Sequence, residues 1–394
     1  FDTGEFRRSD GPGQHNAASA WADGFVGTGV SIAVIDTGID PDSPEFAGRL
    51  SPDSIDIYGT RDLEGSDDHG PLVSLVAAAA RDDTGILGMA WDATVLAIRA
   101  DEPGSCAGDD PTNPNSDCAF VDTAIADSVD YAVANDARVI NISLGGPGGI
   151  APVLETAIEN AVNAGVLVVV AAGNNGRSEL TEFAELMGVT GNGGVIVVGS
   201  VDENYEISDF SNRAGANTAF YIAARGETIC CVYENGEIFV DDEGFAYLFS
   251  GTSFAAPQVA GAAALLAQAF PHLTGTEIAE ILLASAWDAG ELGPDGIYGQ
   301  GILDIAAAFQ PIGTTQLAGE TTAMALGDSS AIASPAMGDA FTTASLPTLV
   351  TDRYRRAFST NLAGTLRGAE VPERLHGALG QGARHLSASS GNVV

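Results

Sequence analysis

Positively charged residues are scarce in this chain of 394 residues, which contains 16 Lys and Arg against 53 Asp and Glu and has a net charge of −37. Binding to nucleic acid needs clustered cations that displace the counterions of the phosphates, so no nucleic-acid partner is expected. A surface with this charge stays soluble and repels copies of itself, and we expect a monomer. The same surface would suit salty surroundings, bound cations or basic substrates.

Long apolar runs are also missing. No stretch reaches the about 18 apolar residues that predict a transmembrane helix. The apolar stretch Gly165–Ala172 is short and rich in β-branched residues, which indicates a buried strand. No secretory signal is visible and the chain starts at Phe1 rather than Met, so we expect a processed product that has lost its targeting segment.

Cysteine is rare as well, with four in the chain. No His or second Cys pair has the spacing of zinc ligands, so a zinc site is not expected. Cys106 and Cys118 flank a loop rich in Gly, Pro, Asn and Asp. A Cys106–Cys118 disulfide would stabilise the fold by about 3 kcal/mol in chain-entropy models and would indicate an oxidising compartment. Cys230 and Cys231 are adjacent, and could form a vicinal disulfide or remain two thiols.

Strand-like and helix-like segments alternate along the first part of the chain. Apolar runs without polar alternation are typical of strands buried on both faces of a parallel sheet, and they cover residues 30–35, 94–98, 138–143, 166–171 and 195–201. Helical spacing covers residues 69–80, 121–135, 153–164, 252–270 and 275–287. The alternation predicts an α/β fold in three layers, with a mostly parallel central sheet and helices on both faces.

Four short motifs carry candidate chemistry. In chain order they are IDTGID with Asp36, DDHG with His69, AAGNNG with Asn174 and SGTSFAAPQVAG with Ser253. Asp36 and Asn174 follow predicted strands, and open α/β sheets place their active sites at the carboxyl ends of strands. Ser253 lies at the amino end of a predicted buried helix.

The residue types in these motifs match the needs of amide hydrolysis. That reaction requires a nucleophile, a base that works near neutral pH and a group that fixes the tautomer of the base. Ser253, His69 and Asp36 can supply these roles in that order. The amino end of the helix at Ser253 and the side-chain NH2 of Asn174 can donate to a developing oxyanion.

The four motifs and their order resemble the subtilisin-like serine proteases, peptidase family S8, from about residue 20 to about residue 310. The resemblance implies a subtilisin-like fold and a serine endopeptidase that hydrolyses proteins or peptides through an acyl-enzyme, with no required cofactor. Asp36 would orient His69, and His69 would act as general base and acid. Ser253 would attack the substrate. Asn174 and the backbone N–H of Ser253 would form the oxyanion hole.

The resemblance also implies a substrate-binding groove. Its candidate residues are Ser143, Leu144 and Gly145 on an edge strand that would pair with the peptide, and Ala171, Ala172 and Gly173 on the wall of the pocket for the residue before the scissile bond. Asn175 occupies a position where a charged residue could have set specificity, so we expect apolar or mixed residues before the cut. Pro71 and Leu72 replace the Thr and His that the family usually has after its His-Gly pair, which alters packing near the groove.

Composition changes near Gln310. Residues 1–310 are the predicted peptidase domain, and residues 311–394, rich in Ala, Gly, Ser and Thr, are a predicted C-terminal linker or tail. Tyr298–Thr315 resembles the end of the protease domain in autotransporter-type bacterial subtilases, and Leu346–Leu362 resembles the link that precedes their outer-membrane β-barrel. This resemblance implies the passenger domain of an autotransporter, secreted or on the bacterial cell surface, with a β-barrel membrane anchor as a partner outside this sequence.

Calcium is a further expectation. Ala80–Ile86 resembles in length a calcium loop of some subtilases, with Asp82 at a ligand position and Glu45 able to approach, and hard cations require several oxygens at once. Exposed acidic loops are also ordinary in a chain this acidic.

Two rival functions stay open: a catalytically silent subtilase-fold surface or adhesion module, and another serine hydrolase chemistry such as an esterase or a peptide ligase. A GxSxG elbow is absent, which disfavours a lipase-type fold.

Overall fold

The chain divides into two compact units, Phe1–Gln310 and Pro311–Val394, in the computed structural model. The structure describes residues 1–65, 68–106, 118–234, 237–319, 323–324, 331–333, 345, 347–361 and 366–368. Among these residues, no helix is both long enough and apolar enough to span a membrane.

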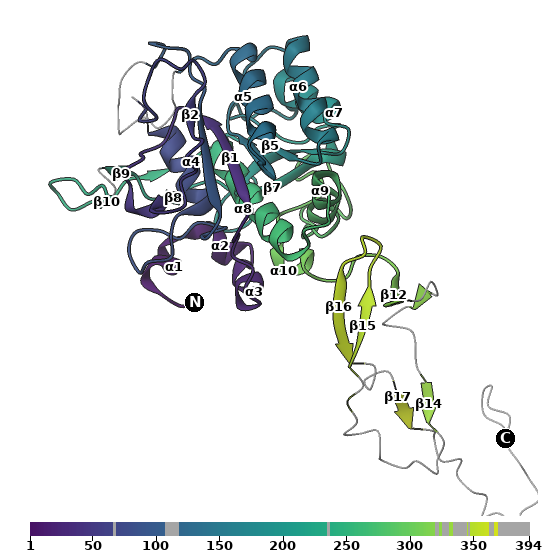
Figure 1. Cartoon of the computed structure of the whole chain (residues 1–394). Coiled ribbons are helices and arrows are strands. Elements are labelled where there is room, and N and C mark those ends of the chain that lie inside the picture. The colour runs from purple at the N-terminus through teal and green to yellow at the C-terminus, as the bar shows by residue number, and fades with distance from the viewer. Residues whose placement is uncertain are drawn as a thin grey trace, which may run out of the picture. The chain divides into compact units, whose positions relative to one another are not determined.

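A seven-stranded sheet forms the centre of the first unit (Figure 1). Its strands, in spatial order, are β2 (Ile55–Asp56), β3 (Thr94–Arg99), β1 (Ser31–Asp36), β4 (Val139–Ile142), β5 (Leu167–Ala171), β6 (Val195–Val201) and β7 (Tyr221–Arg225). Every neighbouring pair is parallel. The predicted mostly parallel sheet is therefore confirmed, and the carboxyl ends of all its strands share one edge.

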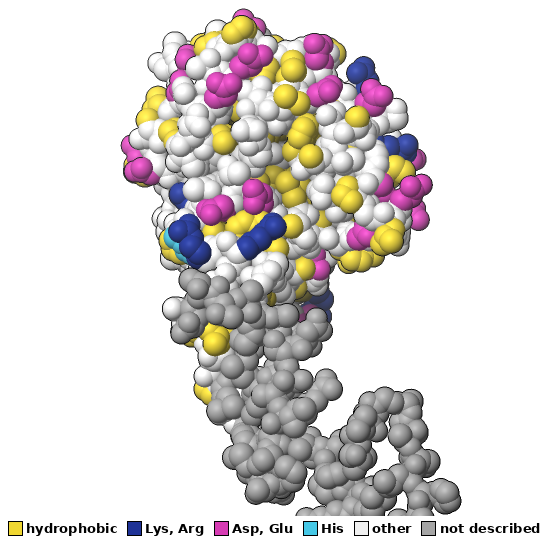
Figure 2. Space-filling view, turned by 90° about the vertical axis from the view of Figure 1, so that its right-hand side faces the viewer, with side chains coloured by type: hydrophobic (Ala, Val, Ile, Leu, Met, Phe, Trp, Pro, Cys, Tyr) yellow, Lys and Arg dark blue, Asp and Glu magenta, His cyan; other side chains and the backbone are white. Residues whose placement is uncertain are grey.

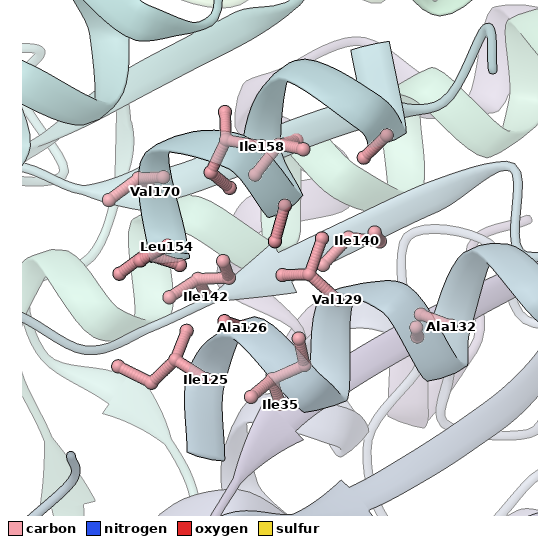
Figure 3. Close-up of a cluster of buried hydrophobic side chains, with 14 of the residues drawn as sticks. Ile35, Ile125, Ala126, Val129, Ala132, Ile140, Ile142, Leu154, Ile158 and Val170 are labelled. Carbon is pink, nitrogen blue, oxygen red and sulfur yellow. The ribbon is translucent and has the colours of Figure 1, made fainter. Parts of the chain in front are cut away.

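Helices cover both faces of this sheet, as predicted. On one face lie α5 (Asp122–Ala134), α6 (Pro152–Asn163) and α7 (Glu182–Thr190); on the other lie α4 (His69–Ala78), α8 (Thr252–Ala269) and α9 (Gly275–Ala284) (Figure 1). Figure 3 shows how β-branched side chains of the strands, such as Ile140 and Ile142, meet Val129 of α5 and Ile158 of α6. The apolar strands are buried on both faces, which explains why their sequences do not alternate.

Helix α8 lies in the interior because it is apolar all round. It packs against α4 and against strands β4 to β7. Most of its residues from Thr252 to Ala267 are Ala, Leu or other small or apolar types, and all of them are buried. Pro257 lies in the second turn and lacks the N–H that would donate to the Ser253 carbonyl oxygen, and that oxygen accepts a hydrogen bond from Ser143 Oγ instead. The amino end of α8 faces the edge of the sheet where the strands end.

Shorter elements complete the first unit. They are α1 (Gly4–Arg8), α2 (Asp10–Gln14), α3 (Ala17–Ala22), α10 (Ile305–Ala308), the 3-10 turns Pro44–Phe46 and Thr218–Phe220, and the strands β8 (Ile229–Cys230), β9 (Tyr233–Glu234), β10 (Glu237–Ile238) and β11 (Leu248–Phe249). The sequence also predicts a short helix near Asn16–Asp23, and α3 confirms it. It predicted neither α1 and α2 nor the paired strands between residues 229 and 249.

The second unit contains strands of its own. One sheet has the order β13 (Ala323–Met324), β12 (Thr315–Leu317), β15 (Pro347–Thr351) and β16 (Ala357–Asn361), and a separate pair joins β14 (Ala331–Ala333) with β17 (Leu366–Gly368). Between β15 and β16, the fully buried Arg356 forms a 2.7 Å ion pair with Asp352. This pair fixes the turn of the antiparallel hairpin that β15 and β16 form.

Candidate active site

Asp36 and His69 meet at the carboxyl edge of the sheet. Asp36 is the last residue of β1 and His69 is the first residue of α4. His69 Nδ1 and Asp36 Oδ1 are 2.8 Å apart, and the same oxygen accepts a 2.8 Å hydrogen bond from the backbone of Thr37. Both side chains are buried. With Nδ1–H donated to the carboxylate, Nε2 becomes the nitrogen that can take up a proton.

Close backbone contact holds α4 against the loop after β1. The backbone N–H of Gly70 donates a 2.9 Å hydrogen bond to Thr37 Oγ1. A Cβ at position 70 would collide with the carbonyl oxygen of Gly38. The glycine that follows His69 therefore lets the two segments approach closely enough for His69 to reach Asp36.

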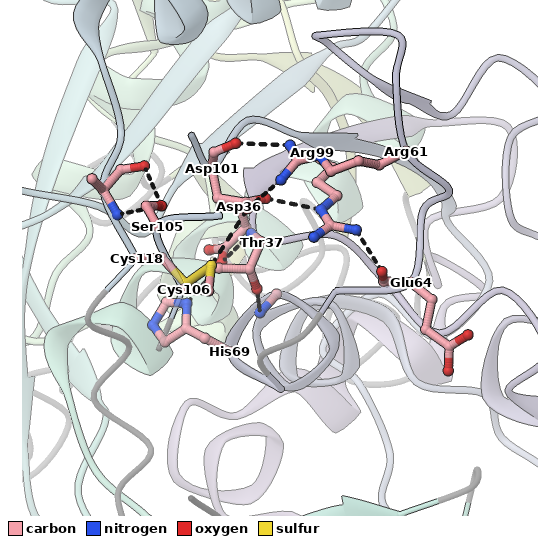
Figure 4. Close-up of a disulfide and its surroundings, with 12 residues drawn as sticks. Asp36, Thr37, Arg61, Glu64, His69, Arg99, Asp101, Ser105, Cys106 and Cys118 are labelled. Carbon is pink, nitrogen blue, oxygen red and sulfur yellow. Dashed lines mark hydrogen bonds and ion pairs between the residues drawn. A yellow bond between two sulfur atoms is a disulfide. The ribbon is translucent and has the colours of Figure 1, made fainter. Parts of the chain in front are cut away.

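Two arginines anchor the segment that leads to His69, and the sequence analysis missed them. Arg99, at the end of β3, donates to Asp101 Oδ1 at 2.9 Å and to the carbonyl oxygen of Glu64. Arg61 donates to Asp56 Oδ1 and to the Asp101 carbonyl oxygen, each at 2.7 Å. Figure 4 shows part of this network beside Asp36 and His69. It pairs two cations with two buried carboxylates, so it adds no net charge behind Asp36.

Ser253 is the second residue of α8 and lies across from the β4 loop. Its hydroxyl donates a 3.2 Å hydrogen bond to the carbonyl oxygen of Ser143, and Ser143 Oγ donates to the Ser253 carbonyl oxygen at 2.7 Å. These reciprocal bonds fix the start of α8 against the end of β4. Proton transfer from Ser253 to His69 requires the Ser253 hydroxyl to turn away from Ser143.

Asn174 is oriented by the residue before Ser253. Asn174 Oδ1 accepts hydrogen bonds from the Thr252 backbone at 2.8 Å and from Thr252 Oγ1 at 2.9 Å. Because the oxygen of the amide is occupied, the NH2 group of Asn174 is the end left to donate. Thr252 is a positioning residue that the motif search did not single out.

A buried asparagine, Asn212, supports the whole turn around Asn174. Its backbone N–H donates to the Gly173 carbonyl oxygen at 2.9 Å, and its Nδ2 donates to the Ala172 carbonyl oxygen at 3.0 Å. Its Oδ1 accepts from the backbone N–H groups of Asn175 and Arg177, at 3.2 and 3.0 Å. No sequence motif marked Asn212, because its partners lie more than thirty positions away.

Most of the predicted site residues line one pocket. They are His69, Ser143, Leu144, Gly145, Ala171, Gly173, Asn174 and Ser253. Ala172 is fully buried and is not part of the lining, and Asp36 lies behind His69. Asn175, which the sequence places at a specificity position, lines the pocket as well. The lining also includes residues that the sequence analysis did not assign to the pocket, namely Cys118, Phe120, Gly146, Pro147, Arg177, Thr181 and Thr252. A cation, Arg177, thus lines a pocket in which no charged group was expected.

Both candidate disulfides are formed. Cys106 and Cys118 are bonded, and Cys118 lines the pocket; the residues between them lie outside the described part of the chain. Cys106 Sγ is 3.4 Å from Asp101 Oδ2, which connects this disulfide to the arginine network (Figure 4). The neighbouring Cys230 and Cys231 are bonded to each other as well.

The candidate calcium region brings Glu45 close to the loop that contains Asp82. Glu45 accepts 3.0 Å hydrogen bonds from the Ala80 backbone and from the Tyr233 hydroxyl. Burial raises the pKa of Glu45 to about 7, and the Asp82 carboxylate adds to that rise. The fully buried Glu5 lies near the same loop, and burial raises its pKa too.

A carboxylate oxygen can bind a cation most readily where no hydrogen bond already occupies it, so the hydrogen bonds of Glu5 and Asp82 decide how well this region fits a cation. Both carboxylate oxygens of Glu5 lack a hydrogen bond of normal geometry among the described residues, whereas Asp82 Oδ1 is occupied by the Thr84 backbone and hydroxyl. Across the described ranges, no cluster of three or more His, Cys, Asp or Glu side chains is arranged as a metal site. A cation here would therefore need backbone carbonyls or water as additional ligands.

Comparison with known proteins identifies related molecules. Residues 27–301 match the protein family described as the subtilase family, Peptidase_S8. The chain is 32% identical over 291 residues to subtilisin DY from Bacillus licheniformis, which covers 73% of this chain and 94% of that protein. It is 35% identical over 255 residues to the major intracellular serine protease of Bacillus subtilis strain 168, covering 64% and 72%.

A solved structure shares the fold. A protease structure from Pseudoalteromonas arctica is similar with a TM-score of 0.62 and 26% identity, covering 78% of this chain and 98% of that chain.

Proposed function

Because this chain belongs to the subtilase family of serine proteases, which act on proteins or peptides, we propose that it is a serine endopeptidase with Asp36, His69 and Ser253 as its catalytic residues. The observation that carries the proposal is the 2.8 Å hydrogen bond from buried His69 to Asp36, beside a pocket that His69 shares with Ser253. An imidazole held in this way can act as the general base that a serine hydroxyl needs.

In the proposed reaction, the Ser253 hydroxyl leaves the Ser143 carbonyl and gives its proton to His69 Nε2 while Oγ attacks the peptide carbonyl. Asp36 stabilises the resulting imidazolium and keeps the ring in place. His69 then protonates the leaving amine, and an acyl-enzyme on Ser253 remains. Water, activated by His69 in the same way, hydrolyses the ester and restores the enzyme.

Two donors serve the oxyanion in this scheme. The backbone N–H of Ser253 belongs to the first turn of α8, where backbone N–H groups have no partner within the helix. The NH2 of Asn174 is the second donor, and its orientation is supported by the two hydrogen bonds from Thr252 to the amide oxygen. Donors fixed in this way stabilise charge without having to reorganise during the reaction.

The peptide would lie along the segment that follows β4. We propose that the backbone of Ser143, Leu144 and Gly145 pairs with the substrate as an added strand. The support for this assignment is that all three residues line the pocket that contains Ser253. Ala171 and Gly173 would form the wall of the pocket for the residue before the cleaved bond, with buried Ala172 behind them.

The test is labelling with a fluorophosphonate, followed by intact mass measurement. The wild-type chain should gain one adduct, and a Ser253→Ala chain should gain none, because the reagent bonds to an activated serine oxygen. Wild type and Ser253→Ala are then compared on casein, for which we expect cleavage by wild type alone. A folded wild-type chain that neither labels nor cleaves would refute the proposal and favour a catalytically silent surface or adhesion module.

We also propose that calcium binds near Glu45 and Asp82. The support is the desolvated carboxylate of Glu45 and the buried, unpaired oxygens of Glu5, since a divalent cation would compensate both. We expect millimolar calcium to raise the melting temperature of the Ser253→Ala chain, and EGTA to reverse that rise. A Glu45→Gln chain should lose the calcium effect; an undiminished effect in that variant would contradict this assignment.

We propose that residues 1–310 act as the peptidase domain and that residues 311–394 link it, as an autotransporter passenger, to the bacterial cell surface. The Cys106–Cys118 disulfide supports an oxidising location. The relatives do not decide the location, because one of them is named an intracellular protease. Protease accessibility on intact cells that express the natural gene provides the test: digestion of the passenger without cell lysis is expected, and its protection would contradict an exterior location.

A further inference from the structure

The lining of the active-site pocket differs in charge from the rest of the molecule. Asp and Glu outnumber Lys and Arg by 53 to 16 in the chain, and acidic side chains are spread over the face shown in Figure 2. No Asp or Glu lines the pocket among the described residues, and its charged lining residue, besides the ionisable His69, is Arg177. A cation is thus present where a substrate would bind, in a chain where cations are rare.

The backbone of Arg177 is fixed on both sides. Its N–H donates a 3.0 Å hydrogen bond to Asn212 Oδ1, and its carbonyl oxygen accepts one of 3.0 Å from the Arg213 backbone. The preceding N–H, of Gly176, donates to the Phe210 carbonyl oxygen at 2.7 Å. The same buried Asn212 also bonds to Gly173 and Asn175, on either side of Asn174, so it fixes the position of Arg177 relative to the proposed oxyanion donor.

The guanidinium group of Arg177 forms no hydrogen bond or ion pair with another residue in the described part of the chain. The acidic residues that follow it along the chain contact other groups: Glu179 lies beside Gly215, and Glu182 lies beside Gly149. No described residue therefore neutralises the positive charge of Arg177, which can face a ligand in the pocket.

We propose that Arg177 makes this enzyme prefer an acidic residue, Asp or Glu, directly before the bond that it cleaves. The inference rests on the proposed peptidase function. The carbonyl of that residue must lie between Ser253 and Asn174, so its side chain is the one that reaches the wall that runs from Gly173 to Arg177. A guanidinium group pairs with a carboxylate through two parallel hydrogen bonds, which gives both charge and shape selectivity.

The net charge of −37 opposes an acidic substrate at long range. Salt weakens this long-range repulsion much more than a direct contact with Arg177, because the screening length is about 8 Å at physiological ionic strength. At that salt concentration the distant carboxylates are largely screened, and the contact in the pocket decides the preference. Kinetic comparisons are therefore made at about 0.15 M NaCl, which matches that ionic strength.

The experiment uses four peptide p-nitroanilides that differ only in the residue before the anilide, which is Glu, Gln, Leu or Lys. In wild type we expect kcat/KM for the Glu peptide to exceed that for the Gln peptide by about 2- to 5-fold, the range for a partly exposed ion pair. Arg177→Gln should bring this ratio to about 1, and Arg177→Glu should shift the preference towards the Lys peptide. Arg7→Gln, which removes an exposed charge outside the pocket, should keep the wild-type ratio.

The outcomes separate this inference from the proposed function on which it rests. A Glu-to-Gln ratio that is equal in wild type and Arg177→Gln overturns the inference, while continued hydrolysis of the peptides still supports the endopeptidase. Absence of both hydrolysis and fluorophosphonate labelling in wild type overturns both. Labelling of Arg177→Gln at the wild-type rate would establish that the variant is folded with an intact nucleophile, so that a changed ratio reports substrate selection.

Discussion

At the scale of single residues, the two ends of the Asn174 side-chain amide have different roles. Its oxygen accepts two hydrogen bonds from Thr252, so it ties the turn after β5 to the start of α8. Its NH2 group is left to donate to the proposed oxyanion. The neighbouring Asn175 also lines the pocket but is held through its backbone N–H. The two asparagines therefore form a matched pair for a test of catalysis.

We predict that Asn174→Ala lowers kcat by about 10²- to 10³-fold with little change in KM, because the lost donor acts mainly in the transition state. The magnitude is the one measured for the matching donor in subtilisin, a member of this family. Steady-state kinetics on one peptide p-nitroanilide check it. Asn175→Ala should retain most of kcat; equal losses in the two variants would mean that the turn, and not the donor, was damaged.

The catalytic candidates could be predicted from the sequence because each lies in a short motif that requires only local context. Asp36 closes a strand, His69 opens a helix and Ser253 opens another. Asn212 and Arg177 could not be predicted in this way. Asn212 acts through hydrogen bonds to a turn that is distant in sequence. Arg177 belongs to that turn, and its place in the pocket lining depends on how the turn is held by Asn212.

At the scale of elements, the Cys106–Cys118 disulfide connects the loop after β3 to the wall of the pocket. Cys118 and Phe120 line the pocket together with His69, and Cys106 contacts the Asp101 carboxylate that pairs with Arg99. The disulfide therefore holds one side of the pocket that we propose binds the substrate.

We predict that the double change Cys106→Ser and Cys118→Ser lowers the free energy of unfolding by about 3 kcal/mol, the chain-entropy estimate for a 12-residue separation, and raises KM more than it lowers kcat. Denaturant unfolding in the Ser253→Ala background measures the first effect, and peptide kinetics measure the second. Cys230→Ser with Cys231→Ser is the control, because adjacent residues close almost no loop. Similar losses of stability in the two double variants would argue against a loop-closure effect.

A buried histidine joins three distant elements of the first unit. His15 follows α2, is fully buried, and its Nδ1 is 2.9 Å from the Leu303 carbonyl oxygen. Its Nε2 accepts a 2.8 Å hydrogen bond from the backbone of Arg225 at the end of β7. Burial lowers the pKa of His15 to about 4. The neutral ring is therefore the form that the folded chain requires.

We predict that His15 makes the fold less stable in acid. The unfolded chain takes up its proton near pH 6.5 and the folded chain only near pH 4, so this contribution is present above pH 6.5 and is lost as the pH falls towards 4. The loss amounts to roughly 3 kcal/mol. Urea unfolding of the Ser253→Ala chain, with and without His15→Gln, measures the free energy of unfolding at about pH 7 and at about pH 4.5. The difference between the two pH values should be smaller in the chain that carries His15→Gln. An identical pH dependence in the two chains would show that other groups cause it.

Elements with a long, clear apolar pattern could be predicted from the sequence, whereas short or weakly patterned ones could not, including the fully buried five-residue strand β7. Strands β1, β3 and β6 and helix α8 have long apolar runs, and their bounds agree with the predictions to within one or two residues. Helix α7 was missed, because its Val189, Thr190 and Gly188 weaken the helical pattern. The strands between residues 229 and 249 have two residues each, too few for a pattern to be recognised.

At the scale of the whole molecule, Asp and Glu outnumber Lys and Arg so far that ion pairs within the chain cannot neutralise them. The described ion pairs use several of the scarce arginines in buried or half-buried positions, as with Arg61, Arg99 and Arg356. In the part of the chain that the structure describes, most remaining carboxylates therefore have no cation beside them. Self-repulsion among these charges destabilises the compact state, so the stability of this chain should depend on ionic strength more than that of a neutral protein.

We predict that raising NaCl from about 0.02 M to about 0.5 M increases the free energy of unfolding by roughly 1–2 kcal/mol, since the screening length falls from more than about 20 Å to less than about 5 Å over this range. Thermal melting of the Ser253→Ala chain, which avoids self-digestion, should shift upwards by a few degrees. KCl should act equally, because screening depends on charge and concentration alone. One millimolar calcium adds almost no ionic strength, so a shift that it causes reports a bound ion and supports the site near Glu45. A melting temperature that stays constant or falls with NaCl would refute a dominant role for self-repulsion.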